Sequence, residues 1–129
     1  MIFLDSSYIK GLILKNDDYN HLSKKIKPFL KNETKVINTT VLVEVLNAVK
    51  RNNYYRDVNE LLVCLTNLDI FDFLAMEDYN KSLEWFNYYG KSINFADCTI
   101  VNTMINLKIN RIVSFDSDFD KINGFERIH

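Results

Sequence analysis

Glycine and proline are scarce in this chain of 129 residues, which contains three glycines and one proline. Gly11, Gly90 and Gly124 are too far apart to form a phosphate-binding loop or a dinucleotide-binding fingerprint, because both need glycines a few residues apart. So few turn-forming residues also leave almost no room for flexible linkers or low-complexity tracts.

Histidine and cysteine are equally rare. His21 and His129 are the only histidines, which argues against a histidine-rich zinc site or a Ser-His-Asp relay. Cys64 and Cys98 each stand alone inside an apolar helical pattern, and we expect both to be reduced core residues. With no signal-peptide pattern at the N-terminus, this cysteine usage predicts a cytoplasmic protein. No apolar run is long enough to span a membrane, so we expect no membrane association.

The composition that remains is that of an ordinary globular protein, with 47% hydrophobic and 26% charged residues. A chain of this length can bury a real core, and we expect residues 1–129 to form a single domain. The net charge is −1, from 16 basic and 17 acidic residues. Because this balance attracts no polyanion to the molecule as a whole, any nucleic acid would have to be held by local cations.

Short apolar runs alternate with helical patterns along the chain. The apolar runs predict strands at residues 1–4, 35–38, 70–74, 111–115 and 125–128. The helical patterns predict a helix capped by a serine after residue 5 and further helices at residues 17–30, 39–51, 55–68, 77–89 and 94–108. The alternation predicts an α/β fold, with three α/β/α layers and a mainly parallel sheet.

Two acidic residues directly follow predicted strands. Asp5 comes after the run at 1–4, and Asp116 comes after the run at 111–115. Either one could simply cap a helix. In open parallel sheets, however, sites form beyond the carboxyl ends of the strands, and two acids at equivalent places favour a site.

Two further acids lie on predicted helices. Asp97 projects near the centre of the apolar face of helix 94–108, and Glu44 lies at the edge of the apolar stripe of helix 39–51. An acid in a first helical turn is favoured by the helix dipole, which explains the sequence position of Asp97 but not its buried direction. Glu44 alone would be taken for a solvated edge residue.

Together with Asp118, these acids form a set of carboxylates with little cationic compensation. On the strand side the nearest cation is Arg111, at the opposite end of its strand. Buried carboxylates are unfavourable unless they are paired or bind a cation, and when clustered they raise each other's pKa values. A divalent metal ion resolves this conflict, so the acids indicate a metal site.

Four segments resemble, in order and spacing, the four motifs of PIN-domain nucleases: residues 3–7, 39–44, 94–100 and 112–119. They are most similar to the small members that act as toxins in VapBC-type toxin-antitoxin pairs. The resemblance implies a PIN-like fold and a catalytic quartet: Asp5, Glu44, Asp97 and Asp116. It also implies metal binding by Asp5, Asp97 and Asp116, with Asp118 as an auxiliary acid. The family usually has threonine where Ser114 stands, and serine keeps the hydroxyl.

The acids and the resemblance predict a Mg²⁺- or Mn²⁺-dependent endoribonuclease that hydrolyses RNA phosphodiester bonds. A bound divalent ion lowers the pKa of a water molecule, positions it for in-line attack and screens the leaving oxygen. The family likeness implies 3′-hydroxyl and 5′-phosphate products, and it leaves open whether one or two ions act. Ser6 and Ser114 are candidates to orient the carboxylates, although Ser6 could equally cap a helix.

A basic and aromatic cluster offers a grip on the RNA. Lys50, Arg51 and Arg56 lie beside Tyr54 and Tyr55, a combination that can hold phosphates and stack unpaired bases. The alternative is a solvated helix end whose cations favour the helix dipole.

Other interpretations of the acids fit less well. An EF-hand loop starting at Asp116 would have Lys121 in place of its glycine and Arg127 in place of its final glutamate. A receiver domain would need an acceptor after a central strand, whereas Asp72 lies inside the run at 70–74 and is expected to face solvent or an edge. A catalytically silent PIN-like binding module and a nuclease for structured DNA remain the alternatives.

Helix 77–89 suggests a protein partner. Its large residues spread around more than half of the helix: Tyr79, Leu83, Trp85, Phe86, Tyr88 and Tyr89. Leu83 and Phe86 are expected in the core, and the others either flank it or form an exposed aromatic patch of the kind that marks interfaces. The resemblance to VapBC-type toxins implies a homodimer and an antitoxin that docks in a groove.

Overall fold

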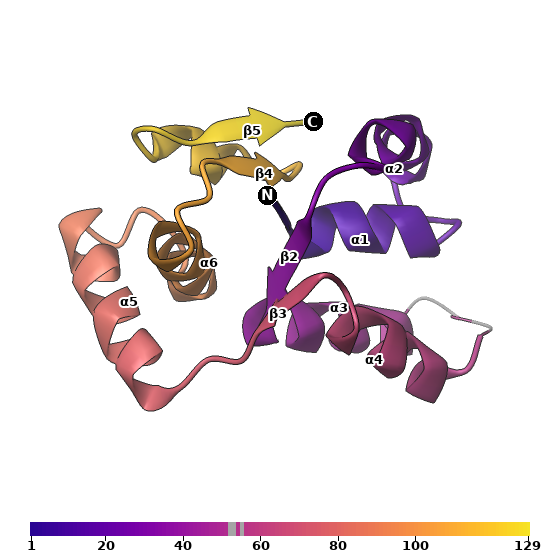
Figure 1. Cartoon of the computed structure of the whole chain (residues 1–129), viewed down its shortest axis with the longest axis horizontal. Coiled ribbons are helices and arrows are strands. Elements are labelled where there is room, and N and C mark those ends of the chain that lie inside the picture. The colour runs from indigo at the N-terminus through magenta and orange to yellow at the C-terminus, as the bar shows by residue number, and fades with distance from the viewer. Residues whose placement is uncertain (52–53, 55) are drawn as a thin grey trace.

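The computed structural model describes residues 1–51, 54 and 56–129, without the side chain of Arg51. Within these residues, five strands form one sheet in the order β3-β2-β1-β4-β5, and every neighbouring pair is parallel (Figure 1). The strands are β1 (Ile2–Leu4), β2 (Lys35–Asn38), β3 (Ile70–Asp72), β4 (Arg111–Val113) and β5 (Glu126–Ile128).

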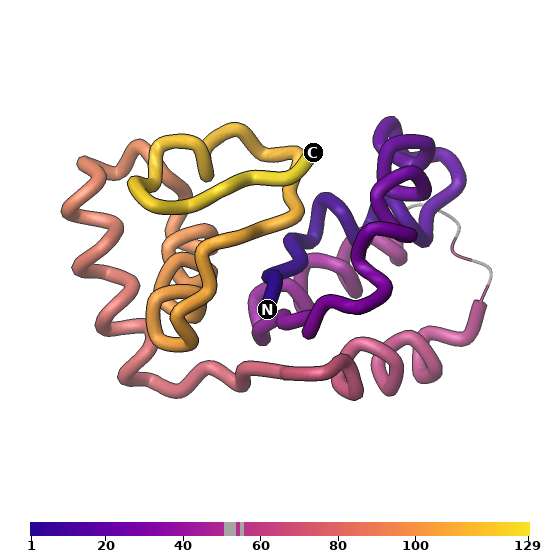
Figure 2. The backbone as a smooth tube through the Cα atoms, turned by 45° about the horizontal axis from the view of Figure 1, so that its top comes forward, coloured from indigo at the N-terminus to yellow at the C-terminus, as the bar shows by residue number. Residues whose placement is uncertain are grey.

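Helices cover both faces of this sheet. They are α1 (Ser6–Ile13), α2 (Asn20–Ile26), α3 (Thr39–Arg51), α4 (Val58–Thr66), α5 (Met76–Tyr88) and α6 (Phe95–Asn106), with 3₁₀ turns η1 (Lys27–Leu30) and η2 (Ser117–Lys121). Figures 1 and 2 show α1 to α4 on one side of the sheet and α5 and α6 on the other. The order of the strands explains this division. The chain adds β2 and β3 on one side of β1 and then β4 and β5 on the other side. Because crossovers between parallel strands are right-handed, the two directions place their helices on opposite faces of the sheet. The predicted three-layer α/β/α fold is confirmed.

The central strands are buried on both faces, as their continuous apolar runs predict. Ile2, Phe3, Val36, Ile37 and Ile112 are fully buried. The register pairs Phe3 of β1 with Val36 of β2 on one side and with Ile112 of β4 on the other. The sheet therefore holds the carboxyl ends of β1 and β4 side by side.

The structure corrects several predicted helix starts. Residues 17–30 do not form one helix: the Asp17 carboxylate accepts a hydrogen bond from the Tyr19 backbone N–H at 2.9 Å, and α2 begins only at Asn20. Pro28 lies in the 3₁₀ turn η1. The cap of α1 is Asp5 and not a serine, since its carboxylate accepts from the Ser7 N–H. An aspartate that forms a turn and an aspartate that caps a helix cannot be told apart in a sequence. This is why the helix was predicted to begin at Asp17, three residues too early.

Other differences concern strand ends and side-chain burial. The third strand ends at Asp72, which lies on an edge strand as expected but is half-buried and accepts a hydrogen bond from Thr103 Oγ1 at 2.7 Å. Cys98 is buried as expected, whereas Cys64 is exposed on α4. Leu83, expected in the core, is 48% exposed.

In the part of the chain that the structure describes, no helix has both the length and the apolar character needed to cross a membrane.

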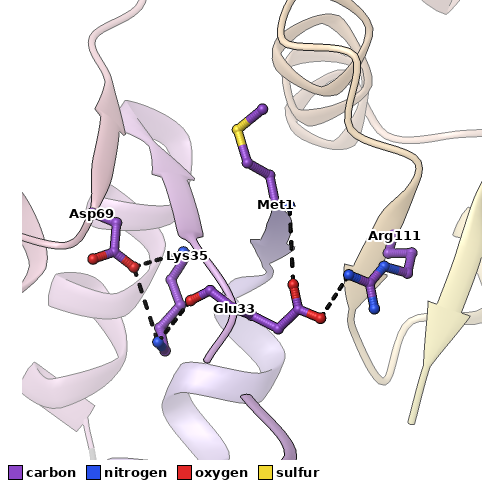
Figure 3. Close-up of polar contacts among 5 residues, drawn as sticks. All are labelled: Met1, Glu33, Lys35, Asp69 and Arg111. Atoms are coloured by element: carbon purple, nitrogen blue, oxygen red, sulfur yellow. Dashed lines mark hydrogen bonds and ion pairs between the residues drawn. The ribbon is translucent and has the colours of Figure 1, made fainter. Parts of the chain in front are cut away.

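A network of ion pairs joins the amino ends of the strands (Figure 3). Glu33 accepts from the Arg111 guanidinium at 2.7 Å and lies 3.9 Å from the N-terminal ammonium of Met1. Asp69 accepts from the Lys35 backbone N–H at 2.8 Å, and its carboxylate lies 3.9 Å from the Lys35 ammonium. The hydrogen bond from Arg111 holds the pKa of Glu33 below its usual range. Arg111 is thus engaged at the edge of the sheet opposite to the acids that follow β1 and β4.

Candidate active site

The candidate site lies beside β1, from which the chain adds strands first on one side (β2, β3) and then on the other (β4, β5). From β1 the chain crosses over one face to β2, whereas β4 is reached over the other face, so the carboxyl ends of β1 and β4 border a topological switch point. Asp5 follows β1 directly and is 4% exposed. Asp116 follows β4 after two further residues and is half-buried. Both acids predicted from strand ends therefore lie at the place where sites form in such sheets.

Two serine hydroxyls hold the Asp5 carboxylate in place. Ser7 Oγ donates to it at 2.6 Å, and Ser114 Oγ donates to it at 2.7 Å. The same hydroxyls accept hydrogen bonds from the backbone N–H groups of Phe115 and Asp116, each at 3.0 Å. The two serines thus bridge the end of β1 to the loop after β4 and fix the relative position of the two acids.

Asp97 is the most perturbed acid of the site. It lies in the first turn of α6 and is 7% exposed. Burial, and then the negative charges of the neighbouring carboxylates, first those of Asp5 and Asp116, together raise its pKa to about 8. Oxygen atoms of Asp97, Asp116 and Asp118 all lie within 4.8 Å of one another. The structure therefore assembles a three-carboxylate cluster from α6 and the segment after β4.

Glu44 reaches the site from α3. Ser6 Oγ donates a short hydrogen bond to its carboxylate, so Ser6 contacts this acid while Asp5 caps the helix. Burial raises the pKa of Glu44, the hydrogen bond from Ser6 lowers it, and the charge of Asp5 raises it. Glu44 lies outside the three-carboxylate cluster, at its border.

Buried polar contacts set the distance between α3 and α6. Asn38 is fully buried at the end of β2, where its amide donates to the Thr99 carbonyl at 3.3 Å and to Thr103 Oγ1 at 3.0 Å. The hydroxyls of Thr40 and Thr99 lie 2.6 Å apart. A cavity of about 300 Å³ beside this contact is lined by Glu44, Tyr79 and Phe95 among others. Sequence reasoning missed Asn38, because a lone asparagine at a strand end carries no signal of such long-range contacts.

Two cations near the acids were also missed. The Lys121 ammonium lies 2.7 Å from the Asp118 carboxylate, a spacing of three residues that sequence could have suggested. Arg127 donates to both carboxylate oxygens of Asp120 at 2.8 Å and to the Ser114 carbonyl at 3.2 Å. Arg127 therefore supports the loop that carries Asp116, and Asp120 is engaged away from the three-carboxylate cluster.

Only part of the predicted basic cluster is described by the structure. Lys50 is exposed near the end of α3, and six residues of helix, about 9 Å along the axis, separate it from Glu44. Arg56 is exposed in the segment before α4. The side chain of Arg51 and the whole of Tyr55 lie outside the described residues.

The donor set fits a hard divalent cation. The cluster offers carboxylate oxygens alone, which are the ligands that Mg²⁺ prefers, and Mn²⁺ accepts the same ligands. Burial is the first cause of the raised pKa of Asp97, and the charges that raise it further are all those of neighbouring carboxylates. A cation bound by Asp97, Asp116 and Asp118 would offset these charges.

Comparisons with solved structures give full-length matches. VapC20 from Mycobacterium tuberculosis, described as a sarcin-ricin loop cleaving toxin, matches with a TM-score of 0.85 and 21% identity over 99% of this chain and 98% of that one. FitAcB from Neisseria gonorrhoeae matches with a TM-score of 0.72 and 17% identity over 100% and 97%. VapBC2 from Rickettsia felis, solved with a DNA fragment from its promoter, matches with a TM-score of 0.66 and 17% identity over 99% and 98%. At such identities the likeness shows the fold.

No curated protein sequence matches the chain. The family model of the PIN domain matches residues 2–124, which is nearly the whole sequence. The chain therefore belongs to the PIN-domain family.

Proposed function

We propose that this protein is a metal-dependent endoribonuclease and the toxin of a VapBC-type pair, active in the cytoplasm. The observation that carries the proposal is the cluster of Asp97, Asp116 and Asp118 at the switch point of the sheet. Membership of the PIN-domain family supports nuclease chemistry, and the structural likeness to VapC20 supports RNA as the substrate class. A nuclease that acts on structured DNA is the alternative.

The residues have distinct tasks in this proposal. Asp97, Asp116 and Asp118 would hold a Mg²⁺ or Mn²⁺ ion, and Asp5 would complete its surroundings. The bound ion would supply a water of lowered pKa and charge screening at the leaving oxygen. Ser7 and Ser114 keep the Asp5 carboxylate oriented through their hydroxyls.

Glu44 would serve the attacking water as a proton acceptor. Its carboxylate lies at the border of the cluster and is held by Ser6, and its raised pKa brings it closer to neutral pH. A general base is most effective when its pKa lies near the working pH.

Cleavage of defined oligomers tests this proposal. Single-stranded RNA and DNA of the same sequence, and a DNA duplex, are incubated with the parent protein in Mg²⁺, Mn²⁺ or EDTA. We expect the RNA to be cut only with metal and Asp97→Asn to be inactive under the same conditions. Cleavage that persists in EDTA, or in Asp97→Asn at saturating Mg²⁺, would refute the site assignment.

We further propose a homodimer. Phe73, Met76 and Leu83 expose large apolar area at the start and along one side of α5, and here they are called the α5 apolar surface. Large apolar residues exposed on one element are often covered at an interface. Sedimentation at micromolar concentration should show a dimer that Leu83→Lys dissociates, and a monomeric parent protein would contradict the proposal.

An antitoxin is the second proposed partner. Its support is the likeness to VapBC2, together with the family resemblance of the four acidic motifs. Co-purification from the native host, with the growth effect of expressing the chain alone, tests it. If no small protein co-purifies with the chain and its expression leaves growth unchanged, the toxin role is excluded. The proposed nuclease activity would not be affected by that result.

A further inference from the structure

Two aromatic rings lie beside the acidic cluster without a part in the chemistry proposed above. Phe115 directly precedes Asp116, and its ring stacks on the ring of Tyr19 with centroids 4.3 Å apart and planes inclined by 5°. Phe115 is half-buried, whereas Tyr19 is 41% exposed. One face of the Tyr19 ring therefore contacts Phe115, while the residue as a whole stays exposed to solvent.

Both residues of the stacked pair are held at the backbone. The Tyr19 N–H donates to the Asp17 carboxylate at 2.9 Å, and the Tyr19 carbonyl accepts from the Ser23 N–H at 2.8 Å. The Phe115 N–H donates to Ser7 Oγ, the hydroxyl that also binds Asp5. Because the pair is anchored to the network that positions the acids, its rings need little ordering when a ligand stacks on them.

The segment that continues from Tyr19 is rich in lysine. Lys24, Lys25 and Lys27 are exposed in α2 and η1. Their charge contrasts with the −1 balance of the whole chain. A nucleic acid that approaches the acidic cluster meets repulsion between its phosphates and the carboxylates, and cations on the neighbouring segment offset this repulsion.

We propose that the stacked Tyr19–Phe115 pair is a platform for an unpaired nucleobase of the substrate strand, next to the phosphate that is cut. The inference rests on the proposed nuclease function and specifies its substrate as single-stranded. A solvent-exposed aromatic ring is the surface on which single-stranded RNA bases stack, and bases in a duplex already stack on one another. Stacking tolerates any base, so the platform selects strand state and not sequence.

The test measures binding separately from cleavage. RNA oligomers that each carry the fluorescent base 2-aminopurine at one position are titrated with Asp97→Asn protein in EDTA, so that no strand is cut. Tyr19→Leu and Tyr19→Phe are added to this background. Leucine still covers Phe115 but removes the ring, whereas phenylalanine keeps the ring and loses only the hydroxyl. The matched control is Phe29→Leu, which removes an 83% exposed ring from η1.

We expect quenching at one position of the oligomer, with affinity lowered about 5- to 100-fold by Tyr19→Leu and within about twofold for Tyr19→Phe and Phe29→Leu. The same oligomer in a duplex should bind more weakly and show no dependence on Tyr19. An equal loss in Tyr19→Leu and Phe29→Leu, or no effect of Tyr19→Leu, would overturn the platform. Because the experiment measures binding in the absence of metal, its result does not depend on whether the parent protein cleaves RNA.

Discussion

Replacing Asp97 by asparagine should stabilise the metal-free protein while it abolishes cleavage. Asp97 is 7% exposed, and its pKa is raised to about 8 by burial and then by the neighbouring carboxylates. Between about pH 4 and about pH 8 the folded chain keeps the Asp97 proton, whereas the unfolded chain loses it. The folded state thus binds more protons, so the free energy of unfolding falls as the pH rises through this window.

The magnitude follows from the pKa shift. The pKa rises from 3.8 to about 8, and each unit corresponds to about 1.4 kcal/mol, so the loss reaches roughly 4 kcal/mol at pH 7 as an upper limit. Relaxation of the site reduces it, and we expect at least about 1 kcal/mol, or a Tm increase of about 3 to 5 °C for Asp97→Asn. Below about pH 4 the variant and the parent protein should be equally stable, because Asp97 is then neutral in both states.

Urea unfolding in EDTA across the window is the assay. Asp18→Asn is the matched control, since it makes the same substitution at an exposed position and should leave the pH profile unchanged. Adding Mg²⁺ should stabilise the parent protein by about 3 kcal/mol at a hundred times its Kd and leave Asp97→Asn unaffected.

A uniform loss of stability for Asp97→Asn at every pH would refute this reasoning. It would mean that the carboxylate acts as a structural hydrogen-bond acceptor at the start of α6. A pH-independent gain would show instead that the charge of Asp97 is balanced in the metal-free fold.

Three further predictions concern other parts of the fold. The free energy of unfolding of Glu33→Gln should fall less steeply below about pH 4.5 than that of the parent protein, because the lowered pKa of Glu33 gives stability that is lost on acidification. Unfolding measured as a function of pH in the acid range checks this. Gly11→Ala should destabilise by about 1 to 3 kcal/mol, since its Cβ would lie 2.3 Å from Ser23 Oγ; Ser23→Ala in the same chain should recover part of the loss in thermal melts. Ser114→Ala should lower the cleavage rate about 10- to 100-fold and Ser114→Thr should retain it, because threonine keeps the hydroxyl that binds Asp5.

The parts of the site that depend on local pattern could be predicted. Asp5 and Asp116 follow apolar runs that are buried strands, and the order of the strands brings these runs together. Asp97 was expected on the buried side of its helix and is 7% exposed. The reason is broader than one apolar face, because residues 97–104 of α6 are all buried. These expectations needed only the periodicity of single elements and the rule that parallel sheets place sites at carboxyl ends.

The contacts that complete the site could not be predicted, because they join residues far apart in sequence. Tyr19 and Phe115 are separated by 96 positions, and each of them alone reads as an ordinary half-buried aromatic residue. Ser6 and Ser114 were the serines expected to orient the acids, and Ser7 was not among them, yet the Ser7 hydroxyl links Asp5 to the loop after β4. Arg127 gave no signal at all, since its role depends on β5 pairing with β4.

Charge is distributed unevenly between the two ends of the strands. At the amino edge, Arg111 and Lys35 are matched by Glu33 and Asp69, so charges there are balanced within the chain. At the carboxyl edge, Lys121 pairs with Asp118, while burial and then the charges of the neighbouring carboxylates raise the pKa of Asp97. A sequence under selection for stability alone would neutralise this edge as well. A metal ion bound as proposed would supply at the carboxyl edge the positive charge that the chain itself supplies at the amino edge, which is why Asp97→Asn and Mg²⁺ are expected to act on stability in the same direction.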